Sequence, residues 1–136
     1  MRARLILPGP PVGMGRPRAD TRRRPVRIHN PQKSIDEQKR ARDLVEGMWT
    51  GEPLGGPLRV DVLAYFAMPP SWSGAKKRRM SGEWHTSKPD RDNIEKLYLD
   101  ALNGLVWKDD ALIADGRCAK FWAPVPRVEV TVEALT

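Results

Sequence analysis

Five aspartates lie close together in a chain that is otherwise strongly basic. They are Asp90, Asp92, Asp100, Asp109 and Asp110, and the 136-residue chain has a formal net charge of +7. Neighbouring carboxylates repel one another unless a proton or a cation neutralises them. A basic protein that gathers acids therefore suggests a cation site, and oxygen-only ligands select a hard ion such as Mg²⁺.

The elements around these acids could bring some of them together. Proline lacks the backbone N–H that a residue inside a helix must donate. A helix is therefore expected to begin just after Pro89, with Asp90 or Asp92 as its N-cap. The apolar residues of 94–102 then recur at helical spacing. Asp110 stands at the entrance to the following strand. If that entrance lies beside the helix start, Asp90, Asp92 and Asp110 meet at one point.

Three such carboxylates could perform phosphate chemistry. A metal ion held by them would polarise a scissile phosphate and lower the pKa of a bound water. Lys96 follows Asp92 by one helical turn and could stabilise the charge that develops on the transferred phosphate.

Ordinary structural roles also explain these residues. An aspartate at a helix N-terminus is favoured by capping and by the helix dipole without any metal. Asp92 and Lys96 have the spacing of a common i,i+4 ion pair, and Asp109-Asp110 could form a turn. The spacing alone leaves these alternatives open.

Composition narrows the class of protein. A sequence pI near 10.0 favours a polyanionic partner such as nucleic acid. A single cysteine, Cys118, excludes an internal disulfide or a zinc–thiolate site and fits a reducing cytoplasmic setting. No apolar run approaches the roughly 20 residues that cross a bilayer, so no membrane partner is expected.

Two basic loops, 9–33 and 69–88, are expected to hold DNA. Clustered cations bind phosphates, and the tryptophans Trp72 and Trp84 in the second loop could stack on bases. The alternatives are solvated loops and tryptophans that anchor the loop to the core, and anchoring is the preferred interpretation for each tryptophan alone. The candidate DNA-binding residues are Arg16, Arg18, Lys76, Lys77, Arg78, Arg79 and Lys88.

The remaining patterns predict one α+β domain over residues 1–136, with a mixed or antiparallel sheet covered by two helices. Besides the 90–102 helix, a helix is expected from Ser34, where Ser34 and Glu37 match a capping box. Strands are expected at 5–7, 58–68, 111–122 with a bulge at Gly116, and 128–132, with a brief one at 26–28.

The motif around the acids resembles the RusA family of Holliday junction resolvases, phage and prophage branch. The matching segments are Lys88-Pro-Asp-Arg-Asp-Asn-Ile-Glu-Lys96, Asp100-Ala-Leu-Asn-Gly104 and Val106-Trp-Lys-Asp-Asp-Ala-Leu-Ile113. Together they follow the family pattern D-x-D-N-x-x-K, then D-A-L, then W-x-D-D. The opening Leu7-Pro-Gly-Pro-Pro11 is also similar.

The resemblance implies a Mg²⁺-dependent endodeoxyribonuclease, with Mn²⁺ as an alternative ion. It places the metal ligands on Asp90, Asp92 and Asp110 and the essential lysine on Lys96, and it leaves Asp100 and Asp109 without a firm role. It further implies a homodimer in the bacterial cytoplasm that nicks two strands of a four-way junction symmetrically. A nuclease for other branched or flap DNA, and a non-catalytic nucleic-acid-binding module, remain as alternatives.

Overall fold

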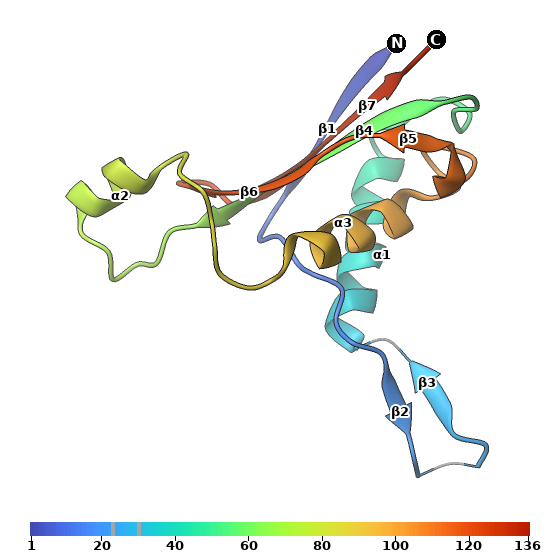
Figure 1. The fold of residues 1–136 in the computed structure, drawn as a ribbon, viewed down its shortest axis with the longest axis horizontal. Coiled ribbons are helices and arrows are strands. Elements are labelled where there is room, and N and C mark those ends of the chain that lie inside the picture. The colour runs from blue at the N-terminus through green and yellow to red at the C-terminus, as the bar shows by residue number, and fades with distance from the viewer. Residues whose placement is uncertain (23, 30) are drawn as a thin grey trace.

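The centre of the molecule is a mixed five-stranded sheet (Figure 1). The computed structural model describes residues 1–22, 24–29 and 31–136. Strand β7 pairs antiparallel with both β1 and β4, and β5 and β6 both pair parallel with β4. The strands are β1 (Arg2–Pro8), β4 (Leu58–Ala67), β5 (Ile113–Asp115), β6 (Cys118–Ala123) and β7 (Arg127–Ala134).

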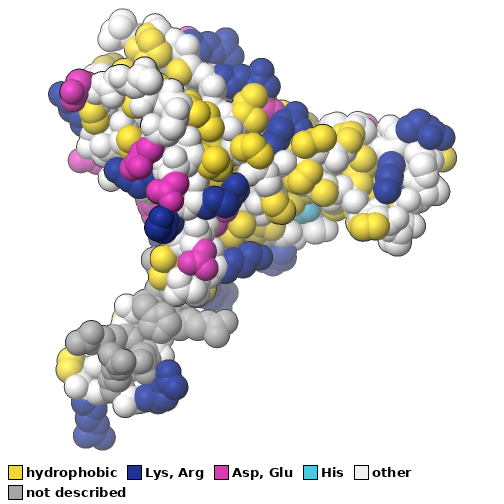
Figure 2. All heavy atoms as spheres, turned by 180° about the vertical axis from the view of Figure 1, so that it is seen from behind, with side chains coloured by type: hydrophobic (Ala, Val, Ile, Leu, Met, Phe, Trp, Pro, Cys, Tyr) yellow, Lys and Arg dark blue, Asp and Glu magenta, His cyan; other side chains and the backbone are white. Residues whose placement is uncertain are grey.

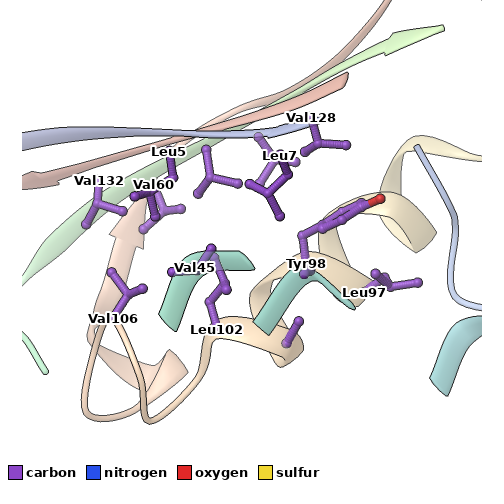
Figure 3. Packing of buried hydrophobic residues seen from close by; sticks show 14 of the residues in the cluster. Leu5, Leu7, Val45, Val60, Leu97, Tyr98, Leu102, Val106, Val128 and Val132 are labelled. Carbon is purple, nitrogen blue, oxygen red and sulfur yellow. The ribbon is translucent and has the colours of Figure 1, made fainter. Parts of the chain in front are cut away.

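Two helices, α1 (Gln32–Glu46) and α3 (Arg91–Leu102), lie together on one face of this sheet. Figure 3 shows Val45, Tyr98 and Leu102 from the helices facing Leu5, Leu7 and other apolar side chains of the sheet. The predicted α+β class and the mixed sheet under two helices are confirmed. A third helix, α2 (Gly74–Met80), and a 3₁₀ turn, η1 (Asp110–Leu112), lie outside this two-layer core. None of the helices in the described ranges is long and apolar enough to cross a membrane.

Alternation along β4 explains why one face is covered. Leu58, Val60, Val62 and Ala64 are buried against the helices, whereas the residues between them are only half-buried. Each fully buried aliphatic side chain contributes about 1.5–3 kcal/mol relative to exposure. The core therefore positions α3, which carries the acidic motif.

The predicted capping box at Ser34 and Glu37 is wrong. Helix α1 begins earlier, at Gln32, with Pro31 at the N-cap and no side-chain cap. Both side chains are buried and bind distant parts of the chain instead. The Ser34 hydroxyl accepts a hydrogen bond from the Gly15 N–H at 2.9 Å, and Glu37 contacts α3. A capping box requires the two side chains at the N-cap and N3 positions. Ser34 and Glu37 lie inside the helix instead, and their buried side chains bind Gly15 and Tyr98.

Glu37 is the centre of a buried polar network that joins α1, α3 and the start of the first basic segment. Tyr98 donates to Glu37 at 2.7 Å and accepts from the Val12 N–H at 3.0 Å. Arg40 donates to both Glu37 oxygens, at 2.6 and 3.0 Å, and to the carbonyl of Pro8 at 2.7 Å. Burial and the bond to Glu37 raise the pKa of Tyr98, so the phenol stays protonated and remains a donor.

Tyr98→Phe is therefore expected to reduce the free energy of unfolding by about 1–3 kcal/mol, because it leaves the Val12 N–H without its partner and removes one of the two donors to a Glu37 oxygen. Urea denaturation of both proteins measures this difference. An unchanged unfolding midpoint would show that the network adds nothing to stability.

The basic segment 9–33 is not simply a loop. It contains a small antiparallel sheet of β2 (Arg18–Asp20) and β3 (Arg27–His29), which projects from the body (Figure 1). Its base is anchored, because Met14 is buried and its N–H donates to the carbonyl of Asn93 at 2.9 Å. The expected brief strand at 26–28 corresponds to β3.

The second basic segment, 69–88, also differs from the prediction, because helix α2 occupies its middle. The Ser73 hydroxyl caps α2 by accepting from the Lys76 N–H at 3.1 Å. After α2, residues 82–85 run beside β6, where the Gly82 and His85 N–H groups donate to the carbonyls of Trp122 and Lys120. This pairing holds the segment against the sheet edge before it turns to α3.

The strand expected at 111–122 is divided in two. Gly116 separates β5 from β6 and has φ +151°, a conformation that favours glycine. A side chain there would meet the Val60 backbone, with a Cβ only 1.9 Å from the carbonyl oxygen. The predicted irregularity at Gly116 is thus confirmed, but it ends a strand rather than bulging within one.

Candidate active site

Asp90 occupies the N-cap position of α3 without acting as a cap. Its side chain accepts no capping hydrogen bond, and Oδ1 instead accepts from Lys88 Nζ at 2.8 Å. That hydrogen bond and the Lys88 charge lower the pKa of Asp90, and Lys120 lowers it further. Asp90 is therefore ionised at neutral pH, and the purely structural explanation by capping does not apply to it.

Asp92 lies in the first turn of α3 and is exposed. Among the described residues, its Oδ1 accepts a hydrogen bond only from the N–H of the adjacent Asn93, at 3.0 Å. Both oxygens therefore remain accessible from solvent, next to the N-terminus of α3, which itself favours negative charge. Asp90 and Asp92 form the acidic half of the candidate site.

Lys96 lies one turn along α3 from Asp92 and is exposed. The alternative of an i,i+4 ion pair with Asp92 is not found: among the residues described, Lys96 has neither an ion pair nor a hydrogen bond. A lysine without a structural partner beside two carboxylates is available to an incoming phosphate.

Asp110 lies at the other end of α3. Its Oδ1 accepts from Trp107 Nε1 at 2.6 Å, and Trp107 itself is fully buried. Burial raises the pKa of Asp110, and the nearby charges of Asp100 and Asp109 raise it further, against the hydrogen bond from Trp107. Asp109 caps η1 by accepting from the Ala111 N–H at 3.1 Å, which is the turn role considered from the sequence.

The expected meeting of Asp90, Asp92 and Asp110 therefore does not occur within one chain. Asp100, whose charge acts on Asp110, is eight residues from Asp92 on the same helix, or about 12 Å along its axis. No group of three or more acidic, histidine or cysteine side chains in the described ranges is placed to hold a metal ion. The sequence-based expectation assumed that a strand start would lie beside the helix start, and the chain instead enters β5 near the helix end.

The predicted DNA-binding residues lie on two separate projections. Arg16 is exposed at the base of the β2–β3 hairpin, and the side chain of Arg18 is outside the described part of the structure. Helix α2 carries Lys76, Lys77, Arg78 and Arg79. Figure 2 shows lysine and arginine side chains on both projections, with acidic side chains on the body between them. Lys88 differs from the others, since it is paired with Asp90.

The two tryptophans of the second basic segment behave differently. Trp72 is half-buried against Trp122, with ring centroids 5.0 Å apart, and Lys76 lies over it at 4.3 Å. Anchoring is therefore confirmed for Trp72. Trp84 is 62% exposed, yet its ring stacks on Phe121 with centroids 5.0 Å apart, so one face is anchored to the sheet and the residue is not part of the core.

Sequence reasoning missed Lys120, which positions the loop before Asp90. Its Nζ donates to the carbonyls of Ser87 at 2.6 Å and Pro89 at 2.8 Å. In β6, Lys120 pairs with Ala64 and thus shares the covered side of the sheet with Cys118. A lysine at an inward position of an otherwise apolar strand was the available signal, because such a charge needs a local partner.

Cys118 lies beside the site but is not poised for reaction. Its thiol is buried, donates to the Arg91 carbonyl at 3.5 Å, and has its pKa raised by burial to about 12. Because the thiolate is the reactive form, we expect no alkylation by iodoacetamide at pH 8 in the native protein and complete alkylation after unfolding. Mass spectrometry distinguishes the two states, and rapid native labelling would show an accessible thiolate.

Two exposed carboxylates beside a lysine with no partner among the described residues, with basic segments on either side, suit a nuclease that acts on a phosphate backbone. Comparison with known proteins identifies the family. The model of the family described as Endodeoxyribonuclease RusA matches residues 8–133, and the chain belongs to this family. It is thus an endodeoxyribonuclease; membership implies Holliday junction resolvase activity on branched DNA and general dependence on a metal ion. The chain is also 38% identical over 133 residues to "Uncharacterized protein YqaN" of Bacillus subtilis (strain 168), covering 94% of this chain and 93% of that protein.

Proposed function

We propose that this protein is a Mg²⁺-dependent, structure-specific endonuclease that resolves Holliday junctions by paired symmetric nicks. The observation that supports this most directly is at the start of α3, where Asp90 and Asp92 are exposed and neither caps the helix with its side chain. Two exposed carboxylates at one helix start are suited to bind a cation. The single-domain organisation over residues 1–136 remains a prediction.

The donor groups fit a hard divalent ion. Asp90 and Asp92 supply oxygen only, and Mg²⁺ keeps several waters and needs few carboxylates. The buried Cys118 thiol is engaged with the Arg91 carbonyl, so it does not offer a soft ligand. Bound at these aspartates, the ion would supply activation of the scissile phosphate and of a water molecule. Mn²⁺ is expected to substitute, because it accepts similar oxygen ligands.

The protein's own residues orient the substrate around that position. Lys96, without a partner in the described structure, places an ammonium where negative charge develops on the phosphate. Lys88 screens Asp90 until substrate arrives, and Lys120 fixes the backbone before it. The cations of α2 and the hairpin bind the phosphates of the junction arms.

Asp110 joins this site only if a second copy of the chain supplies it. Within one chain the helix α3 separates Asp110 from Asp92, and a rigid helix cannot bring its two ends together. A homodimer resolves the difficulty, because two-fold symmetry offers the Asp110 end of one copy to the Asp92 end of the other. The same symmetry matches a junction in which two strands are cut.

Mixed dimers test this arrangement. Asp92→Asn and Asp110→Asn homodimers should each be inactive. In a mixture refolded at equal amounts, a site shared between copies restores one intact site in each heterodimer, or about a quarter of all sites by random pairing. Single-strand nicking of a junction measures the recovery. If each chain builds its own site, no heterodimer is active and the mixture does not nick the junction.

Substrate choice tests the function itself. We expect cleavage of a four-way junction with Mg²⁺, less cleavage of a flap, and least of a linear duplex of the same sequence. Preferred flap cleavage would identify the chain as a nuclease for other branched DNA. If the protein binds all three DNAs and cleaves none of them, it is a non-catalytic nucleic-acid-binding module.

A further inference from the structure

A groove beside the candidate site is lined by residues that the sequence motif does not include. It has a volume of about 380 Å³ and is lined by residues of β6, of the segment between α2 and α3, and of the start of α3. Its walls combine an exposed aromatic ring with cations. The residues used below are Trp84, His85, Arg91, Arg117 and Lys120.

Trp84 presents a fixed aromatic surface to this groove. The ring is 62% exposed yet stacks on Phe121 at a centroid distance of 5.0 Å with the planes 27° apart. The Trp84 backbone is also bridged to Phe121, and Phe121 stacks in turn on Tyr65 at 5.5 Å. The indole is therefore held in place from one side and open on the other, which lowers the entropy lost when another ring stacks on it.

Two arginines provide the charge. Arg117 uses its backbone N–H to bind Asp61 at 2.9 Å, and Arg91 uses its carbonyl to accept from Cys118. Both guanidinium groups are exposed and make no hydrogen bond or ion pair with the residues described. Arginine without an acidic partner is suited to a phosphate, which it can contact through two N–H groups.

The groove is built on a rigid frame that connects it to the carboxylates. His85 forms its floor, 6% exposed, with its ring stacked on Phe66 at 3.8 Å. Lys120 lines the groove and also holds the carbonyls of Ser87 and Pro89, directly before Asp90. Arg91 directly follows Asp90 in the chain. A ligand in the groove is thus adjacent to the proposed cleavage position.

We propose that this groove binds one unpaired nucleotide of the DNA strand next to the phosphate that is cut, with the base stacked on Trp84 and its phosphate held by Arg91 and Arg117. The inference rests on the proposed function for its substrate. Stacking of this kind is open to every base, because each has an aromatic face. A strand held this way must be unpaired at that nucleotide, so the groove would favour junctions over continuous duplex, because stacking is interrupted at the exchange point and a base pair there opens at lower cost.

Trp84→Leu and Trp84→Phe separate stacking from simple packing. Binding to a four-way junction is measured in EDTA, so that cleavage plays no part, with 2-aminopurine placed in turn at each nucleotide around the cut position. We expect Trp84→Leu to weaken binding roughly 5- to 150-fold and to abolish quenching at one nucleotide. Trp84→Phe, which keeps an aromatic face, should retain both. Because Trp84 is exposed, both variants are expected to fold, and circular dichroism checks this.

Arg117→Ala and Arg2→Ala provide a matched pair for the charge. Arg2 is an exposed arginine at the outer end of β1, away from the groove. Arg117→Ala should weaken junction binding and reduce the salt dependence by about one phosphate contact, whereas Arg2→Ala should do neither. Equal effects of the two variants would mean that Arg117 contributes only to the net charge of the protein, and would overturn its assignment as a phosphate contact in the groove.

Several outcomes would overturn the groove as a nucleotide site. Unchanged binding and quenching in Trp84→Leu would do so, and so would a loss of binding explained by dimer dissociation in sedimentation, which would make Trp84 a contact between copies. The proposed function fails separately: if the wild type cleaves no DNA yet Trp84-dependent quenching persists, the nuclease assignment is rejected and the groove is kept.

Discussion

Asp92→Asn is expected to abolish junction cleavage while junction binding is retained or becomes tighter. The substitution keeps the size of the side chain and removes one negative charge at the start of α3. Partners that only support metal ligands change activity about 10–100-fold when mutated, so loss of a direct ligand should cost at least about 100-fold in rate. Less repulsion from the DNA phosphates explains the tighter binding. Single-turnover cleavage and a binding assay in Ca²⁺ measure the two effects.

Asp43→Asn is the matched control, because Asp43 is an exposed aspartate on α1 that pairs only with Lys39 at 2.7 Å. It makes the same change of net charge away from the site and should leave the cleavage rate unchanged. Comparable nicking by Asp92→Asn and the wild type would remove Asp92 from the mechanism. Loss of cleavage in both variants would point to net charge rather than to a metal ligand.

Gly116→Ala should be the most damaging of the glycine-to-alanine substitutions in the described part of the chain, because its Cβ makes the closest approach. An alanine Cβ would lie 1.9 Å from the Val60 carbonyl oxygen and 2.8 Å from its carbonyl carbon, in a central strand that cannot move aside. Backbone strain at φ +151° adds to the collision. We expect a loss of about 3 kcal/mol or more in the free energy of unfolding, measured by urea denaturation with an unchanged m-value.

Gly82→Ala separates the two causes. Gly82 has φ +83°, but an added Cβ there would meet nothing within 4 Å. Its substitution should cost about 1–2 kcal/mol from backbone conformation alone. If Gly116→Ala costs no more than Gly82→Ala, the close approach to Val60 is relieved by movement of the strand, and the break between β5 and β6 does not depend on glycine.

Local patterns were sufficient where a short stretch of chain determines its own structure. Helix α3 could be predicted because Pro89 precedes it, apolar residues recur through it, and Gly104 with φ +80° follows its end. Alternation likewise located β4 and β7, because a sheet covered on one side buries every second residue. The motif at Asp90, Asp92 and Lys96 could be found in the same way, since Asp90 directly precedes α3 and the other two lie in its first turns.

Other features depended on contacts between distant parts of the chain. Ser34 and Glu37 have the spacing of a capping box, but Gly15 and Tyr98 compete for them, and burial decides in favour of the distant partners. The basic segments also acquired structure that their composition does not show, because α2 and the β2–β3 hairpin are short and weakly apolar.

The acidic cluster illustrates the division most clearly. The residue order alone was enough to show that five aspartates gather in and after one helix, that they match the RusA family pattern, and that basic segments precede them in the chain. Their separation became visible in the three-dimensional fold: Asp90 and Asp92 are exposed at the start of α3, Asp110 is bound by Trp107 near its end, and Asp109 caps η1. The physical reason is that spacing fixes neighbours along a helix, whereas the position of a strand entrance depends on packing against the whole sheet.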